Sequence, residues 1–175
     1  MRARGIIAAI LGVIALAAGT PAAAQPTDIE VKAEFLPRFA RYVTWPGAAM
    51  PTASEPFVLC ILGADPFGGL VDKASRGQTV GGRRIIVKRL SAASGADACH
   101  LAFVAGSATR TTAQMLAGIG RKPVLTVTDD GGQRGIIHFS VAGGRVRFFI
   151  DQAAASERGL TISSRLLALA IGVKK

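Results

Sequence analysis

The side chains of this chain that could do chemistry are two histidines, one pair of adjacent carboxylates and one serine in a loop. A general base needs a group that orients it, but His100 precedes an apolar run and His138 alternates outward in a strand pattern, so neither has an evident partner. Asp129 and Asp130 are neighbours in an extended segment and point to opposite faces, which favours a strand-ending turn. Ser107 lacks the G-x-S-x-G elbow of an esterase and favours a loop or helix cap. Because no catalytic constellation is complete, the sequence predicts a protein that is not an enzyme.

Cofactor sites are not expected either. The segment "GADPFGG" resembles a phosphate-binding loop, but it has neither the GxGxxG spacing nor the Lys-Ser/Thr pair of a P-loop. If the two cysteines pair with each other, only His100 and His138 remain, and a zinc site would be short of the usual ligands. We therefore expect no nucleotide and no metal.

The first 24 residues have the layout of a secretory signal peptide. Arg2 and Arg4 form the charged start, residues 6–18 the apolar stretch, and three alanines ending at Ala24 the cleavage site. The apolar stretch falls short of the ~20 residues that span a membrane. We expect cleavage near Ala24, a periplasmic location, and one domain formed by residues 25–175.

The charge of the chain is strongly basic, at +10. Two of the 21 basic residues and none of the 11 acidic ones lie in the signal, which leaves +8 for the exported part. Export removes nucleic acid as a partner, and the basic residues are scattered instead of forming a block. An acidic protein partner or an anionic membrane surface fits this charge, and so does a plain solvated basic surface.

The two cysteines, Cys60 and Cys99, would be exported to an oxidising compartment, where an even pair favours a disulfide. There is no CxxC motif for redox catalysis. The bond is therefore expected to be structural, although a single disulfide can still act as a redox-dependent stability switch.

Apolar spacing predicts the order of the secondary structure. Residues 28–44 favour a largely buried helix, in which Pro37 introduces a kink or delays the start and which Trp45-Pro46 ends. Beyond it, short apolar runs typical of strands alternate with helical segments. The strands are expected at 56–63, 83–90, 100–106 and 123–130. Residues 64–77 are expected to form a turn and a short helix, and residues 107–122 a helix.

The pattern changes in "GIIHFSVAGGRVRFFID", where two alternating strands flank a glycine turn and predict an antiparallel hairpin. One face of the hairpin is apolar and the other carries Arg145 and Arg147. Phe149 is the one aromatic residue that the alternation places on this polar face, although it could equally lie under the following helix, which is the more common place for a phenylalanine.

The last apolar run follows Thr161, Ser163 and Ser164, all good residues for a helix start, and has helical spacing as far as Val173. Arg165 in the first turn is disfavoured by the helix dipole, which indicates a compensating carboxylate or partner. As a whole the sequence predicts an α/β fold, a single compact domain with helices flanking a mixed, mostly parallel sheet, followed by the C-terminal antiparallel hairpin and this helix.

Several motifs together resemble, in order and spacing, the YfiR family of periplasmic proteins; they are "VKAEFLPRFARYVTWP", "CILGADPFGG", "CHLAFVAGS" and above all "RVRFFIDQAAASERGLTISSRLLALA". The resemblance implies a protein without cofactor or catalysis that binds the periplasmic sensor region of a membrane diguanylate cyclase. It would hold the cyclase inactive and so lower cyclic di-GMP and biofilm formation. The resemblance further implies an outer-membrane lipoprotein of the OmpA type that titrates the repressor away, and a homodimer.

Cys60 and Cys99 match the cysteine pair of the YfiR family, whose disulfide is linked to the stability of the repressing form. The chain departs from the family at Pro37, which leaves the shape of the opening helix open, and at Phe149, where a polar or acidic residue is more usual. It also lacks the second cysteine pair of some members, so one disulfide carries any redox response.

Two hypotheses follow. In the first, the chain is a repressor whose partner contacts are made by Arg145, Arg147, Phe149 and Arg165. In the second, it is a small-ligand sensor or an accessory protein of another receptor or transporter, for which a sizeable pocket with convergent polar groups would speak.

Overall fold

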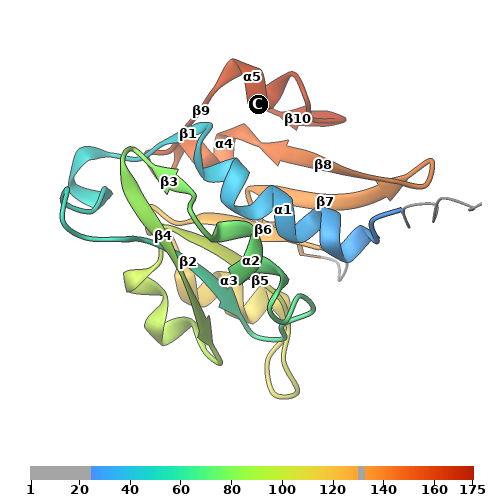
Figure 1. The fold of residues 1–175 in the computed structure, drawn as a ribbon, viewed down its shortest axis with the longest axis horizontal. Coiled ribbons are helices and arrows are strands. Elements are labelled where there is room, and N and C mark those ends of the chain that lie inside the picture. The colour runs from blue at the N-terminus through green and yellow to red at the C-terminus, as the bar shows by residue number, and fades with distance from the viewer. Residues whose placement is uncertain (1–24, 130–132) are drawn as a thin grey trace, which may run out of the picture.

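The computed structural model describes residues 25–129 and 133–175, so the predicted signal peptide and Asp130 lie outside the described part (Figure 1). The helices are α1 (Asp28–Ala40), α2 (Leu70–Ser75), α3 (Thr112–Ile119), α4 (Gln152–Ser156) and α5 (Ser164–Leu167), with 3-10 turns η1 (Gly47–Ala49) and η2 (Ala93–Ala98). The strands are β1 (Val43–Thr44), β2 (Phe57–Leu62), β3 (Thr79–Val80), β4 (Arg83–Leu90), β5 (Leu101–Val104), β6 (Leu125–Thr128), β7 (Ile137–Ala142), β8 (Arg145–Asp151), β9 (Thr161–Ile162) and β10 (Gly172–Lys174). Within the described residues, no helix is long and apolar enough to cross a membrane.

The main sheet has eight strands in the order β10-β8-β7-β6-β5-β2-β4-β3. The central strands β4, β2, β5, β6 and β7 run parallel to one another, while β8 is antiparallel to β7 and β3 to β4. This confirms the predicted α/β fold with a mixed, mostly parallel sheet. A second, two-stranded sheet pairs β1 with β9.

The sheet is covered on both faces, which explains why its central strands β2, β5 and β6 are buried at every position. Along β2, alternate residues belong to two separate cores. Leu59 and Ile61 pack on the face covered by α1 and α2, with Leu36 and Val71 of these helices. On the other face the core is completed by α3, represented by Met115.

Helix α1 begins at a capping box that joins Thr27 and Glu30, each side chain accepting the backbone N–H of the other. The helix ends at Ala40, earlier than predicted, because residues 43–44 form β1 and pair with β9. Their β-branched side chains favour this extended conformation. Pro37 is buried inside the helix, so the expected delay of the start was wrong.

Strands β7 and β8 form the predicted hairpin around Gly143-Gly144. Both glycines have positive φ, 58° and 68°, as a two-residue turn between twisted strands requires. The register places Phe139 opposite Phe148 on the core side.

The last helix is shorter than predicted. Ser163 caps α5 by accepting the N–H of Leu166, but the helix ends at Leu167. Val173, expected on the same helix, lies in β10 instead, which runs parallel to β8. The parallel pairing is possible because Gly172 has no side chain: a Cβ there would lie 2.9 Å from Cδ1 of Phe149.

Candidate partner-binding surface and a polar cleft

Three of the four predicted contact residues lie on one face of β8. The alternation of the strand sends Val146 and Phe148 to the core side, where the Phe148 ring lies 5.0 Å from that of Phe39 in α1. Arg145, Arg147 and Phe149 point to the opposite side, and both arginines are exposed. The structure therefore brings these three residues together in a row.

The two arginines have no carboxylate partner among residues 25–129 and 133–175. Arg89 on β4 shows the contrast: its guanidinium binds Asp65 and Asp72, and its hydrogen bond to Asp72 lowers the pKa of that carboxyl. Arg89 thus stabilises the fold, whereas the guanidinium groups of Arg145 and Arg147 are available to bind an anion.

Phe149 is half-buried and has two neighbours of its own. The guanidinium carbon of Arg134 lies 4.7 Å from the ring centroid, within the range of a cation–π interaction. The other neighbour is Gly172 of β10, which makes close contact with the ring. Phe149 therefore helps to join β10 to the hairpin. Neither of the two expected positions, on the polar face or under the following helix, describes it fully.

Arg165 lies on α5 and is exposed. The sequence predicted that a carboxylate or a partner compensates the charge of Arg165. In the part of the chain that the structure describes, no carboxylate pairs with it. No described hydrogen bond, ion pair or ring contact joins Arg165 to β8. The structure thus does not assemble it with the other three predicted contact residues.

Cys60 and Cys99 form a disulfide with a Cα–Cα distance of 5.8 Å. Cys60 lies in the centre of β2 and Cys99 directly follows η2. Both residues belong to the core under α3, where they are almost fully buried. The bond therefore fastens the η2 segment to the middle of the sheet.

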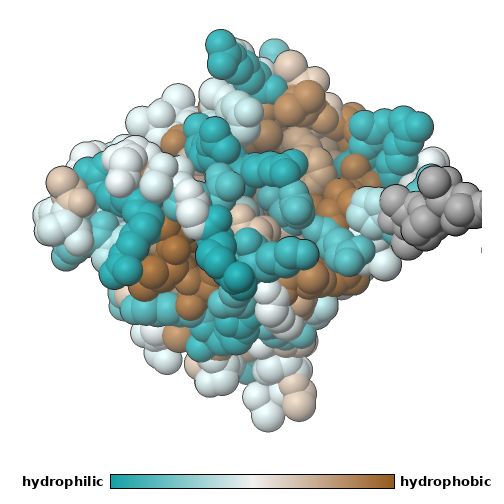
Figure 2. Space-filling model, in the orientation of Figure 1, coloured by the Kyte–Doolittle hydropathy of each residue, from teal (hydrophilic) through white to brown (hydrophobic). Residues whose placement is uncertain are grey.

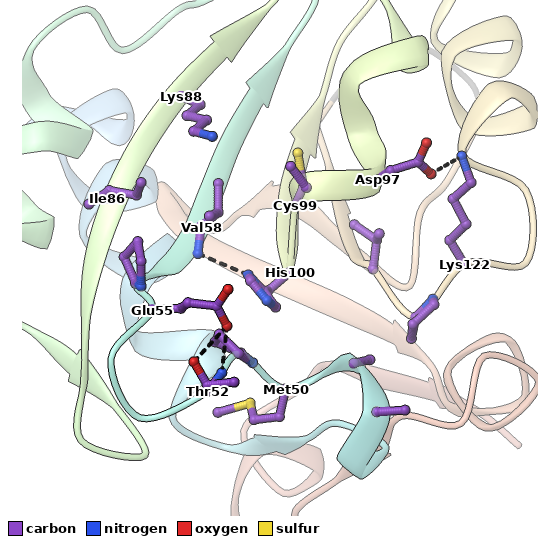
Figure 3. A pocket seen from close by; sticks show the side chains of 17 residues that line it. Met50, Thr52, Glu55, Val58, Ile86, Lys88, Asp97, Cys99, His100 and Lys122 are labelled. Carbon is purple, nitrogen blue, oxygen red and sulfur yellow. Dashed lines mark hydrogen bonds and ion pairs between the residues drawn. The ribbon is translucent and has the colours of Figure 1, made fainter.

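A cleft of about 720 Å³ opens next to this disulfide (Figure 3). Its apolar lining includes Val58, Ile86 and Cys99. Figure 3 shows that the polar side chains around it come from different elements; they are Thr52, Glu55, Lys88, Asp97, His100 and Lys122. No sequence pattern indicated this cleft, because its lining residues are far apart in the chain.

His100 is one of the titratable groups that line the cleft. Its Nδ1 accepts the backbone N–H of Val58 at 2.9 Å, and the ring stacks on Phe57. Burial lowers the pKa of His100, and the accepting Nδ1 places the proton of the neutral ring on Nε2. Glu55 nearby accepts the N–H and hydroxyl of Thr52, and these bonds lower the pKa of its carboxyl.

Lysines supply the positive charge of the cleft. Lys122 forms an ion pair with Asp97. Lys88 is exposed and has no ion-pair partner among the described residues. The cleft thus offers a cation, a neutral imidazole N–H and a carboxylate around an apolar wall.

The other residues considered as catalytic candidates have structural partners. His138 is buried, not outward as predicted, and its Nδ1 lies 2.9 Å from the hydroxyl of Thr128. Asp129 pairs with Lys32. Ser107 lies in the loop before α3, where its hydroxyl accepts a backbone N–H, while a different residue caps the helix.

The loop that resembles a phosphate site is filled by the protein itself. The carboxylate of Asp65 accepts the backbone N–H groups of Phe67 and Gly68. An anion of the chain thus takes the place that a phosphate would need. In the described residues, no group of three or more His, Cys, Asp or Glu side chains could hold a metal ion.

The arrangement is therefore suited to recognition, with a row of unpaired cations on β8 and a polar cleft beside the disulfide. A search among curated proteins found no match. A family model described as YfiR/HmsC-like matches residues 29–171, which covers almost all of the described chain. The protein therefore belongs to the YfiR/HmsC-like family.

Proposed function

We propose that this protein is a periplasmic regulator that represses a membrane diguanylate cyclase by binding the sensor region of the enzyme. The match to the YfiR/HmsC-like family over residues 29–171 is the observation that carries the proposal. Repression lowers cyclic di-GMP and with it biofilm formation. The chain acts by binding and not by catalysis, and residues 1–24 serve as the export signal.

The contact face in this proposal is the row formed by Arg145, Arg147 and Phe149, with Arg165 as a separate cationic contact. The two arginines on β8 are exposed and unpaired within the described residues, so an acidic sensor region would find charged donors that the fold does not use. An outer-membrane lipoprotein of the OmpA type would compete for the repressor, and the free repressor would be a homodimer.

The Cys60–Cys99 disulfide would adjust this activity. Reduction frees the η2 segment from β2, loosens the core under α3 and lowers the population that can bind the cyclase. Cyclic di-GMP would then rise under reducing conditions.

The test is cellular cyclic di-GMP in a strain that lacks the gene. We expect the level to rise on deletion, to return with the wild-type gene and to stay high with Cys60→Ser. Arg145→Ala/Arg147→Ala should also fail to restore repression while its melting temperature stays that of wild type, because both side chains are exposed. An unchanged level after deletion would reject the repressor function.

The cleft beside the disulfide favours a second candidate, a small-ligand sensor or an accessory protein of another receptor or transporter. Its apolar wall and convergent polar groups are of the kind that binds small molecules. A ligand that raises the melting temperature of wild type but not of Lys88→Ala/His100→Ala would support this function. Without such a ligand it loses its support.

A further inference from the structure

The outer edge of β8 is only half covered. Strand β10 pairs with Phe149, Ile150 and Asp151, the last three residues of β8. Among the described residues, β10 is the last strand on this side of the main sheet, and β8 is next to it. Where β10 does not reach, no other described strand pairs with β8. The four residues Arg145–Phe148 therefore form a free edge next to the hairpin turn, away from β10 (Figure 1).

Two hydrogen bonds fix which backbone groups face outward. The N–H of Asp151 donates to the carbonyl of Ile136, which directly precedes β7. Backbone groups of an antiparallel strand alternate in direction, so those of Phe149, Arg147 and Arg145 also point toward β7. The carbonyl of Phe148 accepts the N–H of Ile171, on the outer side. It follows that the N–H and C=O of Val146 and the N–H of Phe148 point outward, and no described strand pairs with them.

The side chains around this edge are of two kinds. Arg145 and Arg147 extend from the edge strand itself on the face away from the core, without ion-pair partners among the described residues. The segment between α5 and β10 carries two exposed apolar side chains, Leu169 at 61% and Ile171 at 46% exposure. Figure 2 shows apolar surface in this region, over α5 and the start of β10.

We infer that the free edge at Val146 and Phe148 is a docking site for an extended acidic segment of a partner protein, which adds to the main sheet as a strand. The inference deepens the proposed function, on which it rests, by naming the mode of contact. Backbone hydrogen bonds would supply affinity, and the arginines would select acidic side chains on alternate positions of the added strand. Apolar side chains of the segment would contact Ile171.

Charge decides between an acidic partner and a second copy of this chain. Antiparallel pairing of two β8 edges would bring the arginines of both copies into cross-strand neighbourhood, and like charges in such positions are destabilising. Cations on an edge strand are a common means of preventing self-pairing. An acidic strand would instead neutralise Arg145 and Arg147.

The test uses the exported chain, residues 25–175, and a soluble seven-residue peptide in which glutamate alternates with valine and threonine. We expect the peptide to shift the amide resonances of Val146 and Phe148. A peptide with lysine in place of glutamate should bind at least about ten-fold more weakly. Methylation of the peptide nitrogens that face β8 should weaken binding about ten-fold, while methylation of the alternate nitrogens should not, because only one set can donate to the edge.

The protein variant is Val146→Pro, with Val146→Ile as its control. Proline removes an N–H that the β7–β8 ladder does not use, so it is tolerated there better than at inward positions. We expect Val146→Pro to lose peptide binding and Val146→Ile to keep it, with both variants folded at the temperature of the measurement. If Val146→Pro does not fold, Arg145→Glu/Arg147→Glu replaces it, and this variant should prefer the lysine peptide.

The following results would overturn the inference: equal binding of both peptides, equal effects of methylation on both sets of nitrogens, or no shift at millimolar peptide. A wild-type dimer that Val146→Pro converts into monomers would assign the edge to a second copy and overturn it as well. No cyclase is present in these measurements. The peptide measurements can therefore reject the docking edge while deletion of the gene still raises cyclic di-GMP. They can also support the docking edge when deletion has no effect and the repressor function is rejected.

Discussion

The Nζ of Lys32 lies 2.7 Å from Oδ2 of Asp129, and this ion pair ties helix α1 to the end of strand β6. The lysine side chain is only 6% exposed and the aspartate side chain 20%. The two residues are 97 positions apart in the chain. A charged residue in the buried stripe of a helix is costly without a partner, so the loss of either side chain would leave the other charge largely buried and unpaired.

Replacing Lys32 by methionine should destabilise the protein by about 2–3 kcal/mol, because Asp129 would remain largely buried without its partner. The matched control is Arg38→Met on the same helix. The ion pair of Arg38 with Glu34 is exposed at both ends, so this change should cost less than about 0.5 kcal/mol. Urea unfolding measures both, and equal costs would contradict a role of the buried pair.

Local patterns were sufficient to predict the central part of the fold. The continuous apolar run of β2 predicted a strand buried on both faces, and the core residues on its two sides confirm it. The alternation in 137–151 predicted the hairpin and its core face in the same way. These features depend on residues close in sequence, where periodicity carries the information.

Features made by distant pairing could not be predicted in the same way. Residues 43–44 and 172–174 are too few to show a period that distinguishes a strand from a helix, and each segment becomes a strand through its partner, β9 or β8. The cleft beside the disulfide likewise combines side chains from separate elements. Of the predicted contact residues, the strand alternation placed Arg145, Arg147 and Phe149 on one face, but nothing local indicated the contact of Phe149 with Gly172.

Reduction of the Cys60–Cys99 bond should lower the free energy of unfolding by about 4 kcal/mol on the chain-entropy estimate for residues 39 positions apart. Thermal unfolding with and without dithiothreitol measures the loss. The double variant Cys60→Ala/Cys99→Ala is the control and should not respond to the reductant. A wild-type melting temperature that the reductant leaves unchanged would show that the bond adds no stability.

Gly63 follows β2 and should not tolerate a side chain. Its φ of +88° is rarely adopted by other residues, and a Cβ would lie 2.2 Å from the carbonyl oxygen of Ala105. We expect Gly63→Ala to cost at least about 2 kcal/mol. Gly69→Ala is the matched control in the same loop, because a Cβ there has open space and φ is −74°. Similar melting temperatures of the two variants would contradict this reading of the turn.

His100 should make the stability depend on pH in a defined direction. Burial lowers its pKa in the folded protein below the ordinary value of 6.5. As the pH falls through 6.5, the unfolded chain therefore takes up the proton before the folded protein does, and the folded state loses stability until the pH reaches the lowered pKa. Below that pKa the loss is constant, and above 6.5 the contribution of the neutral ring is complete.

The comparison variant is His100→Asn, whose side-chain oxygen can accept the N–H of Val58 in place of Nδ1 but does not titrate. Between pH 7.5 and pH 5, wild type should lose more stability than the variant, by a small amount because solvent screens the exposed part of the ring. Carboxylates that titrate in the same range affect both proteins equally, so the difference isolates His100. Parallel pH profiles would mean that His100 keeps an ordinary pKa and that the cleft is more open to water than its geometry indicates.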